Sequence, residues 1–176
     1  RRAQDPPTTG GRVLSYVYDS GLAELDELAS RAARLAHGVN GLDPTVFPSV
    51  ARIHGGIVDR VREILGGGPD VFGSVTSGGT ESCVLACLAA REVWRREPGR
   101  GGTIVAPVTV HAAFRKAAHL LGLRFVGVEV DPDTGRVTAD ELLAAVDAET
   151  VLVVCSAPSY PTGVIDPVAE VAAGLE

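Results

Sequence analysis

The sequence has no methionine and only one lysine, Lys116, among its 176 residues. Because residue 1 is therefore not an unprocessed translation start, we expect the chain to be a fragment of a longer protein. Aromatic residues are scarce at 5% of the chain, and no basic run is longer than a pair such as Arg95-Arg96. A net charge of −6 without a basic or aromatic-basic face argues against a nucleic-acid-binding protein.

Long apolar runs are also absent. No run approaches the roughly 20 residues that a membrane-spanning helix needs, and no charged-then-apolar leader precedes the body of the chain. The three cysteines, Cys83, Cys87 and Cys155, fall at apolar positions of expected elements, which favours buried thiols. A metal site at Cys83 and Cys87 would need further ligands that the sequence does not provide. We therefore predict a cytoplasmic protein with no transmembrane segment and no metal site.

A glycine turn lies near the middle of the chain, in the string SVTSGGTESCVLACL from Ser74 to Leu88. Gly78 and Gly79 have no Cβ, so the backbone can turn sharply there and come close to a ligand. A helix follows directly, with Ser77 or Thr80 as its expected cap. Unpaired N–H groups and the positive end of the helix dipole suit a phosphate. The same string is also an ordinary capped turn without a ligand, and no lysine follows the glycines as in a nucleotide-binding P-loop.

Helices and strands are expected to alternate beyond residue 70, which is typical of an α/β fold with a mostly parallel sheet and helices on both faces. The expected strands are residues 13–18, 103–108, 124–130 and 151–155. The expected helices are residues 20–36 with Asp19 or Ser20 as cap, 49–65, 80–94 and 112–121, one that opens at the capping box Thr138–Glu141, and one with Asp166 as cap and Pro167 at its first position. The string from Asp131 to Gly135 is expected to form a tight turn. We divide the chain into an N-terminal segment, residues 1–68, and the first part of a larger α/β domain, residues 69–176.

Polar groups follow the expected strands at one edge of this sheet. They are the glycine turn, His111 after the strand 103–108, and the loop Ser156–Thr162 after the strand 151–155. In open α/β sheets, ligands bind at the carboxyl ends of the strands. His111 by itself could equally be a helix cap, but its place directly after a strand favours a functional role. We expect the other histidines to be structural: His37, His54 and His119.

Three ordered strings resemble one family: VTSGGTES from Val75, HAAFRKAA from His111 and SAPSYPTGVIDP from Ser156. They are similar to the group II decarboxylase superfamily that depends on pyridoxal 5'-phosphate, and most similar to its sphingosine-1-phosphate lyases and their bacterial relatives. The string NGLDPTVFPS from Asn40 extends the resemblance over nearly the whole chain. The resemblance implies a fold-type-I domain like that of aspartate aminotransferase, pyridoxal phosphate as cofactor, a small amine or amino-acid substrate, and a homodimer when full length.

The resemblance also implies roles for individual residues. Gly79 and Thr80 would hold the cofactor phosphate with help from Ser82, and His111 would stack on the pyridine ring as a catalytic residue. The cofactor-binding residues would then be Gly79, Thr80, Ser82, His111 and Ser156. Tyr18 and Asn40 would line the site.

The chain departs from the family pattern in two places. Asn40-Gly41-Leu42-Asp43 stands where the family commonly has Asn-Pro-Leu-His, and the helix around His54 lacks the usual acidic residues. The family's His-x-Asp strand and its Schiff-base lysine follow the Ser156 loop, at positions past Glu176. Lys116 matches a different family lysine, and we expect it to be an exposed helix residue.

Three functions remain open from the sequence. The first is a carbon–carbon lyase, either a carboxy-lyase or an aldehyde-lyase, that acts on an amino acid or a phosphorylated amino alcohol, with this fragment inactive alone. The second is another fold-type-I enzyme such as an aminotransferase. The third is a non-catalytic module that binds pyridoxal phosphate or dimerises.

Overall fold

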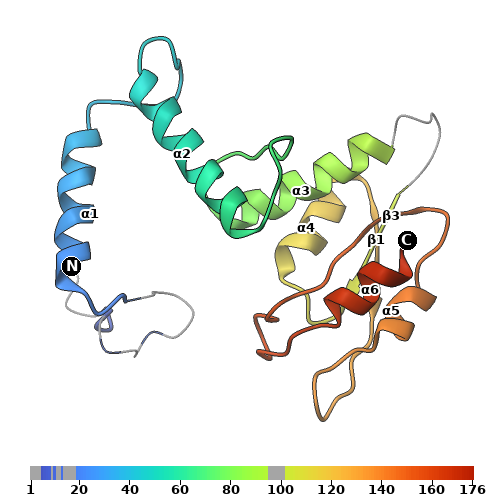
Figure 1. Cartoon of the computed structure of the whole chain (residues 1–176). Helices are drawn as coiled ribbons and strands as arrows, with labels where there is room; N and C mark the ends of the chain where they lie inside the picture. The colour runs from blue at the N-terminus through green and yellow to red at the C-terminus, as the bar shows by residue number, and fades with distance from the viewer. Residues whose placement is uncertain (1–4, 9, 11–12, 14–18, 95–101) are drawn as a thin grey trace. The chain divides into compact units, whose positions relative to one another are not determined.

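A computed structural model describes residues 5–8, 10, 13, 19–94 and 102–176 (Figure 1). The chain forms two compact units, Arg1–Val75 and Thr76–Glu176. The strand expected at 13–18 lies outside the described residues except for Val13, and Tyr18 lies outside them as well.

The second unit is built on a parallel sheet with the strand order β2-β1-β3. Its strands are β1 (Thr103–Pro107), β2 (Arg124–Val128) and β3 (Thr150–Val153). The central strand β1 pairs with β2 in continuous register from Thr103 to Pro107, and with β3 through an irregularity between Thr103 and Ile104. The carboxyl ends of all three strands therefore meet at one edge of the sheet.

Apolar side chains cover both faces of this sheet. Ile104 and Ala106 of β1 belong to one buried cluster, whereas Val105 between them belongs to the other. Alternation of this kind, with both sets apolar, places a strand between two covering layers. The first face is covered by α3 (Gly79–Trp94) and α4 (Ala112–Leu121), and the second by α5 (Ala139–Ala144) and α6 (Val168–Gly174). The predicted α/β fold with helices on both faces is confirmed.

Several helix ends and turns are set by residues that lie only a few positions apart in the sequence. The helix α4 spans the predicted residues and ends where Gly122 adopts φ 65°, a left-handed conformation that favours glycine. The helix α5 opens with the predicted capping box, in which Thr138 and Glu141 satisfy each other's backbone N–H groups. The Oδ1 atom of Asp131 accepts three hydrogen bonds from Asp133 and Thr134, as the predicted tight turn requires.

The expected buried thiols are confirmed for Cys87, which is fully buried, whereas Cys83 and Cys155 are half-buried. Burial raises the pKa of the Cys87 thiol, with a smaller contribution from Cys83, and burial also raises the pKa of the Cys155 thiol. A raised pKa keeps these thiols protonated and therefore poorly nucleophilic. Among the described residues, no group of three or more His, Cys, Asp or Glu side chains could hold a metal ion.

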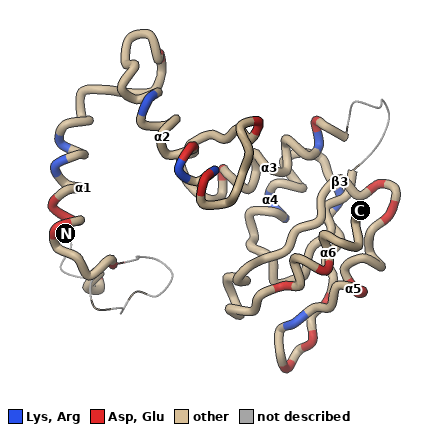
Figure 2. Tube along the Cα trace, viewed as in Figure 1, with Lys and Arg blue, Asp and Glu red and all other residues tan. Residues whose placement is uncertain are grey.

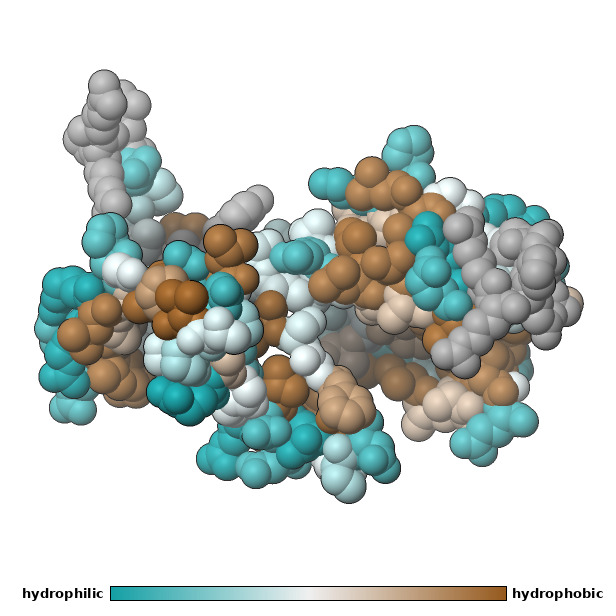
Figure 3. Space-filling model, turned by 90° about the horizontal axis from the view of Figure 1, so that it is seen from above, coloured by the Kyte–Doolittle hydropathy of each residue, from teal (hydrophilic) through white to brown (hydrophobic). Residues whose placement is uncertain are grey.

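The first unit contains the helices α1 (Ala23–Ala36) and α2 (Pro48–Ile64), and neither has a buried residue. The predicted cap of α1 by Asp19 or Ser20 is wrong, because Leu22 occupies that position without a side-chain hydrogen bond. Asp19 instead accepts from the N–H of Gly21 and Ser20 from the N–H of Leu22, in a turn ahead of the helix. The brown areas in Figure 3 are hydrophobic residues that lie at the surface of the molecule.

Charged side chains of both signs are distributed along the described chain (Figure 2). None of the described helices combines the length and the apolar character needed to cross a membrane.

Candidate functional site

The glycine turn is held by hydrogen bonds among its own side chains. The hydroxyls of Thr76 and Ser82 lie 2.7 Å apart, and Thr76 Oγ1 also donates to the carbonyl of Gly78 at 3.0 Å. The N–H of Ser82 donates to the same carbonyl at 3.2 Å, which fixes the first turn of α3. These hydrogen bonds hold the turn around the carbonyl of Gly78.

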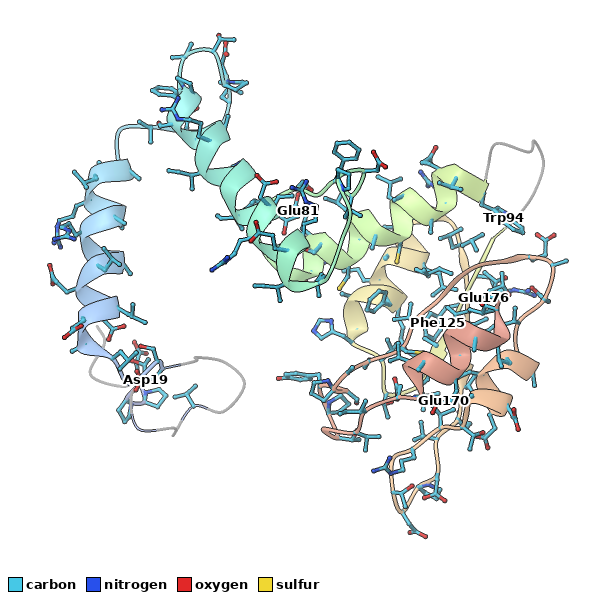
Figure 4. The ribbon with its side chains drawn as sticks, viewed as in Figure 1. Asp19, Glu81, Trp94, Phe125, Glu170 and Glu176 are labelled. Atoms are coloured by element: carbon cyan, nitrogen blue, oxygen red, sulfur yellow. The ribbon has the colours of Figure 1, made fainter. Side chains whose placement is uncertain are left out.

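Glu81, labelled in Figure 4, binds Ser77, one of the two residues that we expected to cap α3. Its Oε2 atom accepts from the N–H of Ser77 at 2.7 Å and from Ser77 Oγ at 2.5 Å. The predicted cap is therefore wrong: among the described hydrogen bonds, neither Ser77 nor Thr80 accepts from an N–H at the start of α3. The hydrogen bonds from the Ser77 hydroxyl and backbone lower the pKa of Glu81. The carboxylate thus stays ionised and occupies both donors of Ser77.

The backbone N–H groups of Gly79 and Thr80 have no acceptor among the described residues, as is usual in the first turn of a helix. A Cβ built on Gly79 would meet nothing within 4 Å, and neither Gly78 nor Gly79 has a positive φ. The conformation of the chain therefore does not require glycine at these positions. Open space beside two unpaired N–H groups at the positive end of a helix dipole fits a phosphate.

His111 is the N-cap of α4. Its Nδ1 atom accepts a hydrogen bond from the N–H of Ala113 at 3.1 Å, so the proton of the neutral ring lies on Nε2. The residue is exposed and follows β1 by four positions. Sequence reasoning left capping and function as alternatives for His111, and the structure shows that the capping bond uses only one ring nitrogen.

Ser156 lies at the start of the loop that follows β3. Its N–H donates to Asp166 Oδ2 at 2.7 Å, and its carbonyl accepts from the N–H of Asp166 at 2.9 Å. These two hydrogen bonds hold the two ends of the loop together. Ser156 itself is half-buried.

The predicted cap of α6 by Asp166 is wrong, because α6 begins one residue later and Pro167 takes the N-cap position without a side-chain bond. The Asp166 carboxylate turns back to Ser156 instead. It is 4% exposed, and its Oδ1 atom has no hydrogen-bond partner among the described residues. A partner ten residues away in the sequence leaves no local pattern, so only the folded loop reveals this pair.

Tyr160, on the same loop, meets His111. The two ring centroids are 5.9 Å apart with an interplanar angle of 79°, which is an edge-to-face arrangement. Sequence reasoning did not single out Tyr160. The available signal was an aromatic residue in a loop after one strand, with a histidine after the neighbouring strand.

The structure therefore joins two of the three predicted sets of polar groups, His111 and the loop after β3. The described hydrogen bonds of the glycine turn stay within the turn, although α3 packs beside α4 and β3. Asn40 is exposed in the other unit, where its Oδ1 atom accepts from the N–H of Leu42 at 3.0 Å. Lys116 is exposed on α4, as expected.

Comparisons with known proteins agree on one family. Residues 52–175 match the family described as aminotransferase class-V. The chain is 40% identical to sphingosine-1-phosphate lyase 1 of Rattus norvegicus over 162 residues, which cover 92% of this chain and 28% of the relative. The chain thus spans just over a quarter of the length of this curated relative.

Solved structures give the same result. The sphingosine-1-phosphate lyase of Burkholderia pseudomallei K96243 superposes with a TM-score of 0.77 at 38% identity, over 88% of this chain and 37% of that chain. A glutamate decarboxylase of Lactobacillus brevis superposes with a TM-score of 0.76 at 22% identity, over 83% of this chain and 35% of that chain, a likeness of fold alone. These matches confirm the family resemblance and the fold type, and the homologues in this family depend on pyridoxal phosphate.

Proposed function

The chain belongs to the aminotransferase class-V family, and on this basis we propose that it is the N-terminal part of a carbon–carbon lyase that uses pyridoxal phosphate. The observation that carries the proposal is the 40% identity to a sphingosine-1-phosphate lyase over 92% of this chain. The substrate class is an amino acid or a phosphorylated amino alcohol, and the reaction is loss of CO₂ or release of an aldehyde. In this proposal the chain alone is inactive, and the full-length protein is a cytoplasmic homodimer.

The glycine turn would hold the cofactor phosphate. The unpaired N–H groups of Gly79 and Thr80 supply hydrogen-bond donors, and the Thr80 hydroxyl supplies a third. The absence of a Cβ at Gly79 lets the phosphate approach the backbone. Ser82 would assist less directly, because its hydroxyl is already hydrogen-bonded to Thr76.

His111 and Ser156 would lie next to the pyridine ring. The Ala113 N–H holds Nδ1 of His111, so the ring can present a face to the cofactor while Nε2 keeps its proton. Ser156, held by Asp166, would border the ring from the neighbouring strand. Pyridoxal phosphate, when bound, supplies an electron sink for the pair of electrons left on a substrate carbon when a bond to that carbon breaks.

The remaining predicted roles belong to this proposal as well. Tyr18 and Asn40 would line the site, in the N-terminal segment of residues 1–68. The lysine that binds the cofactor covalently and the aspartate that pairs with the pyridine nitrogen would come from residues beyond this chain.

The full-length protein tests the proposal directly. Purified protein loaded with pyridoxal phosphate is incubated with a phosphorylated amino alcohol and, separately, with a set of amino acids, and released aldehyde and CO₂ are measured. Release of either product supports a lyase and identifies which reaction occurs. The absence of both products, together with transfer of the amino group to a keto acid, would support the aminotransferase alternative. Cofactor binding without any turnover would support a non-catalytic module.

Lys116 is not expected to carry the cofactor. The full-length protein is reduced with borohydride in the presence of pyridoxal phosphate, digested, and the labelled peptide identified by mass spectrometry. We expect the label on a lysine outside residues 1–176, and the Lys116→Arg variant should incorporate as much label as the unmodified protein. A labelled peptide containing Lys116 would contradict this assignment.

A further inference from the structure

The loop after β3 makes a ring contact that the proposed function does not use. We propose that Tyr160 is a positioning residue for His111, and that its ring fixes the direction in which His111 presents its face to the cofactor. The inference rests on the proposed role of His111 beside the pyridine ring. The observation that motivates it is the edge-to-face contact between the two rings, with centroids 5.9 Å apart.

One hydrogen bond alone does not fix the His111 ring. The bond from the Ala113 N–H to Nδ1 holds a single atom, and the exposed ring can still tilt about it. The contact with Tyr160, at an interplanar angle of 79°, adds a second constraint from another element. Two constraints from α4 and from the loop after β3 define the ring plane.

Hydrogen bonds of the preceding residue fix the backbone of the loop at Tyr160. The preceding residue, Ser159, is 2% exposed, its N–H donates to Val164 at 2.7 Å, and its carbonyl accepts from Gly163 at 2.9 Å. The Thr162 hydroxyl donates to Ser159 Oγ at 3.0 Å. Thr162 also lies close to the turn after β2, because a Cβ added to Gly135 would be 3.2 Å from Thr162 Cγ2.

The ring of Tyr160, rather than its hydroxyl, makes the contact. Tyr160 is 57% exposed, and its hydroxyl has no hydrogen-bond partner in the part of the chain that the structure describes. Loss of the ring should therefore change the orientation of His111 while leaving the core intact. Loss of the hydroxyl alone should change neither.

The experiment compares Tyr160→Ala with the matched control Tyr160→Phe in the full-length protein. Circular dichroism in the absorption band of bound pyridoxal phosphate reports the orientation of groups around the cofactor. We expect Tyr160→Ala to weaken this band and to raise the cofactor dissociation constant roughly two- to tenfold, the range of an aromatic pair. Tyr160→Phe should keep both values, and the melting temperatures of the two apoproteins should match that of the unmodified protein.

A second measurement does not need the cofactor. Proton NMR of the apoprotein, with His111→Ala used for assignment, follows the ring protons of His111, whose shifts depend on the nearby aromatic ring. We expect Tyr160→Ala to move these resonances and Tyr160→Phe to keep them.

The outcomes separate the two proposals. Equal effects of Tyr160→Ala and Tyr160→Phe, or unchanged His111 resonances and dichroism in Tyr160→Ala, would overturn the positioning role. If the unmodified protein fails to bind pyridoxal phosphate while the His111 resonances still depend on Tyr160, the ring contact stands and the proposed function fails.

Discussion

The Gly79→Ala variant of the full-length protein is expected to bind pyridoxal phosphate roughly tenfold to a hundredfold more weakly, the cost of forcing an extra methyl group into a closely packed contact. The reason is local. The added Cβ would occupy the open space beside the unpaired N–H groups of Gly79 and Thr80, where we place the phosphate. Equilibrium dialysis of the apoprotein against pyridoxal phosphate measures the change.

The same variant provides its own control. Apart from its chain neighbours and the backbone of α3, no described atom lies within 4 Å of a Cβ at Gly79, and alanine favours a helix over glycine by up to about 1 kcal/mol. The apoprotein should therefore unfold at the same denaturant concentration as the unmodified apoprotein, or at a higher one. Unchanged cofactor affinity together with this stability would mean that no phosphate lies against Gly79.

Leu142→Ala should lower the free energy of unfolding by about 2–5 kcal/mol, the usual cost of truncating a fully buried leucine. Leu142 is 0% exposed and packs, from α5, into the cluster that contains Val105, Val137 and Val171. The truncation leaves a cavity on one face of the sheet. Denaturant unfolding followed by far-ultraviolet circular dichroism gives the difference.

Leu120 is the matched control for this change. It is also a helical leucine in the second unit, on α4, but it is 60% exposed. Leu120→Ala should therefore change the free energy of unfolding by no more than about 0.5 kcal/mol. Similar losses in the two variants would show that the face of the sheet beneath α5 is not a packed core.

Sequence patterns that involve residues no more than about four positions apart were sufficient to predict much of the second unit. The apolar spacing of α4, its end at Gly122, and the capping box of Thr138 and Glu141 each depend on neighbours along the chain. The strands of this unit were also predictable, because a parallel sheet covered on both faces requires continuous apolar runs such as residues 104–107.

Hydrogen bonds to distant or competing partners were not predictable from the sequence. Asp166 has the sequence position of a helix cap, yet its carboxylate binds the N–H of Ser156 in the folded loop. Ser77 looked like an accepting cap, but the Glu81 carboxylate is the stronger acceptor and uses Ser77 as a donor. In both places several polar groups compete, and tertiary geometry decides which pair forms.

The sequence predicted where the candidate site lies, but not how its side chains contact one another. The position of His111 and Ser156 after neighbouring parallel strands indicated one edge of the sheet, and the contact of Tyr160 with His111 joins those two segments. The contact itself depends on how the Ser156–Gly163 loop folds over Ser159, which no spacing rule describes. The roles of Tyr18 and Asn40 stay predictions.

The most direct test of the account is a crystal structure of the full-length protein with pyridoxal phosphate bound. We predict phosphate oxygens within hydrogen-bond distance, about 2.7–3.2 Å, of the backbone nitrogens of Gly79 and Thr80. The His111 ring should lie against the pyridine ring and keep its contact with Tyr160. A phosphate bound elsewhere, with the N–H groups of Gly79 and Thr80 facing only water, would contradict the account.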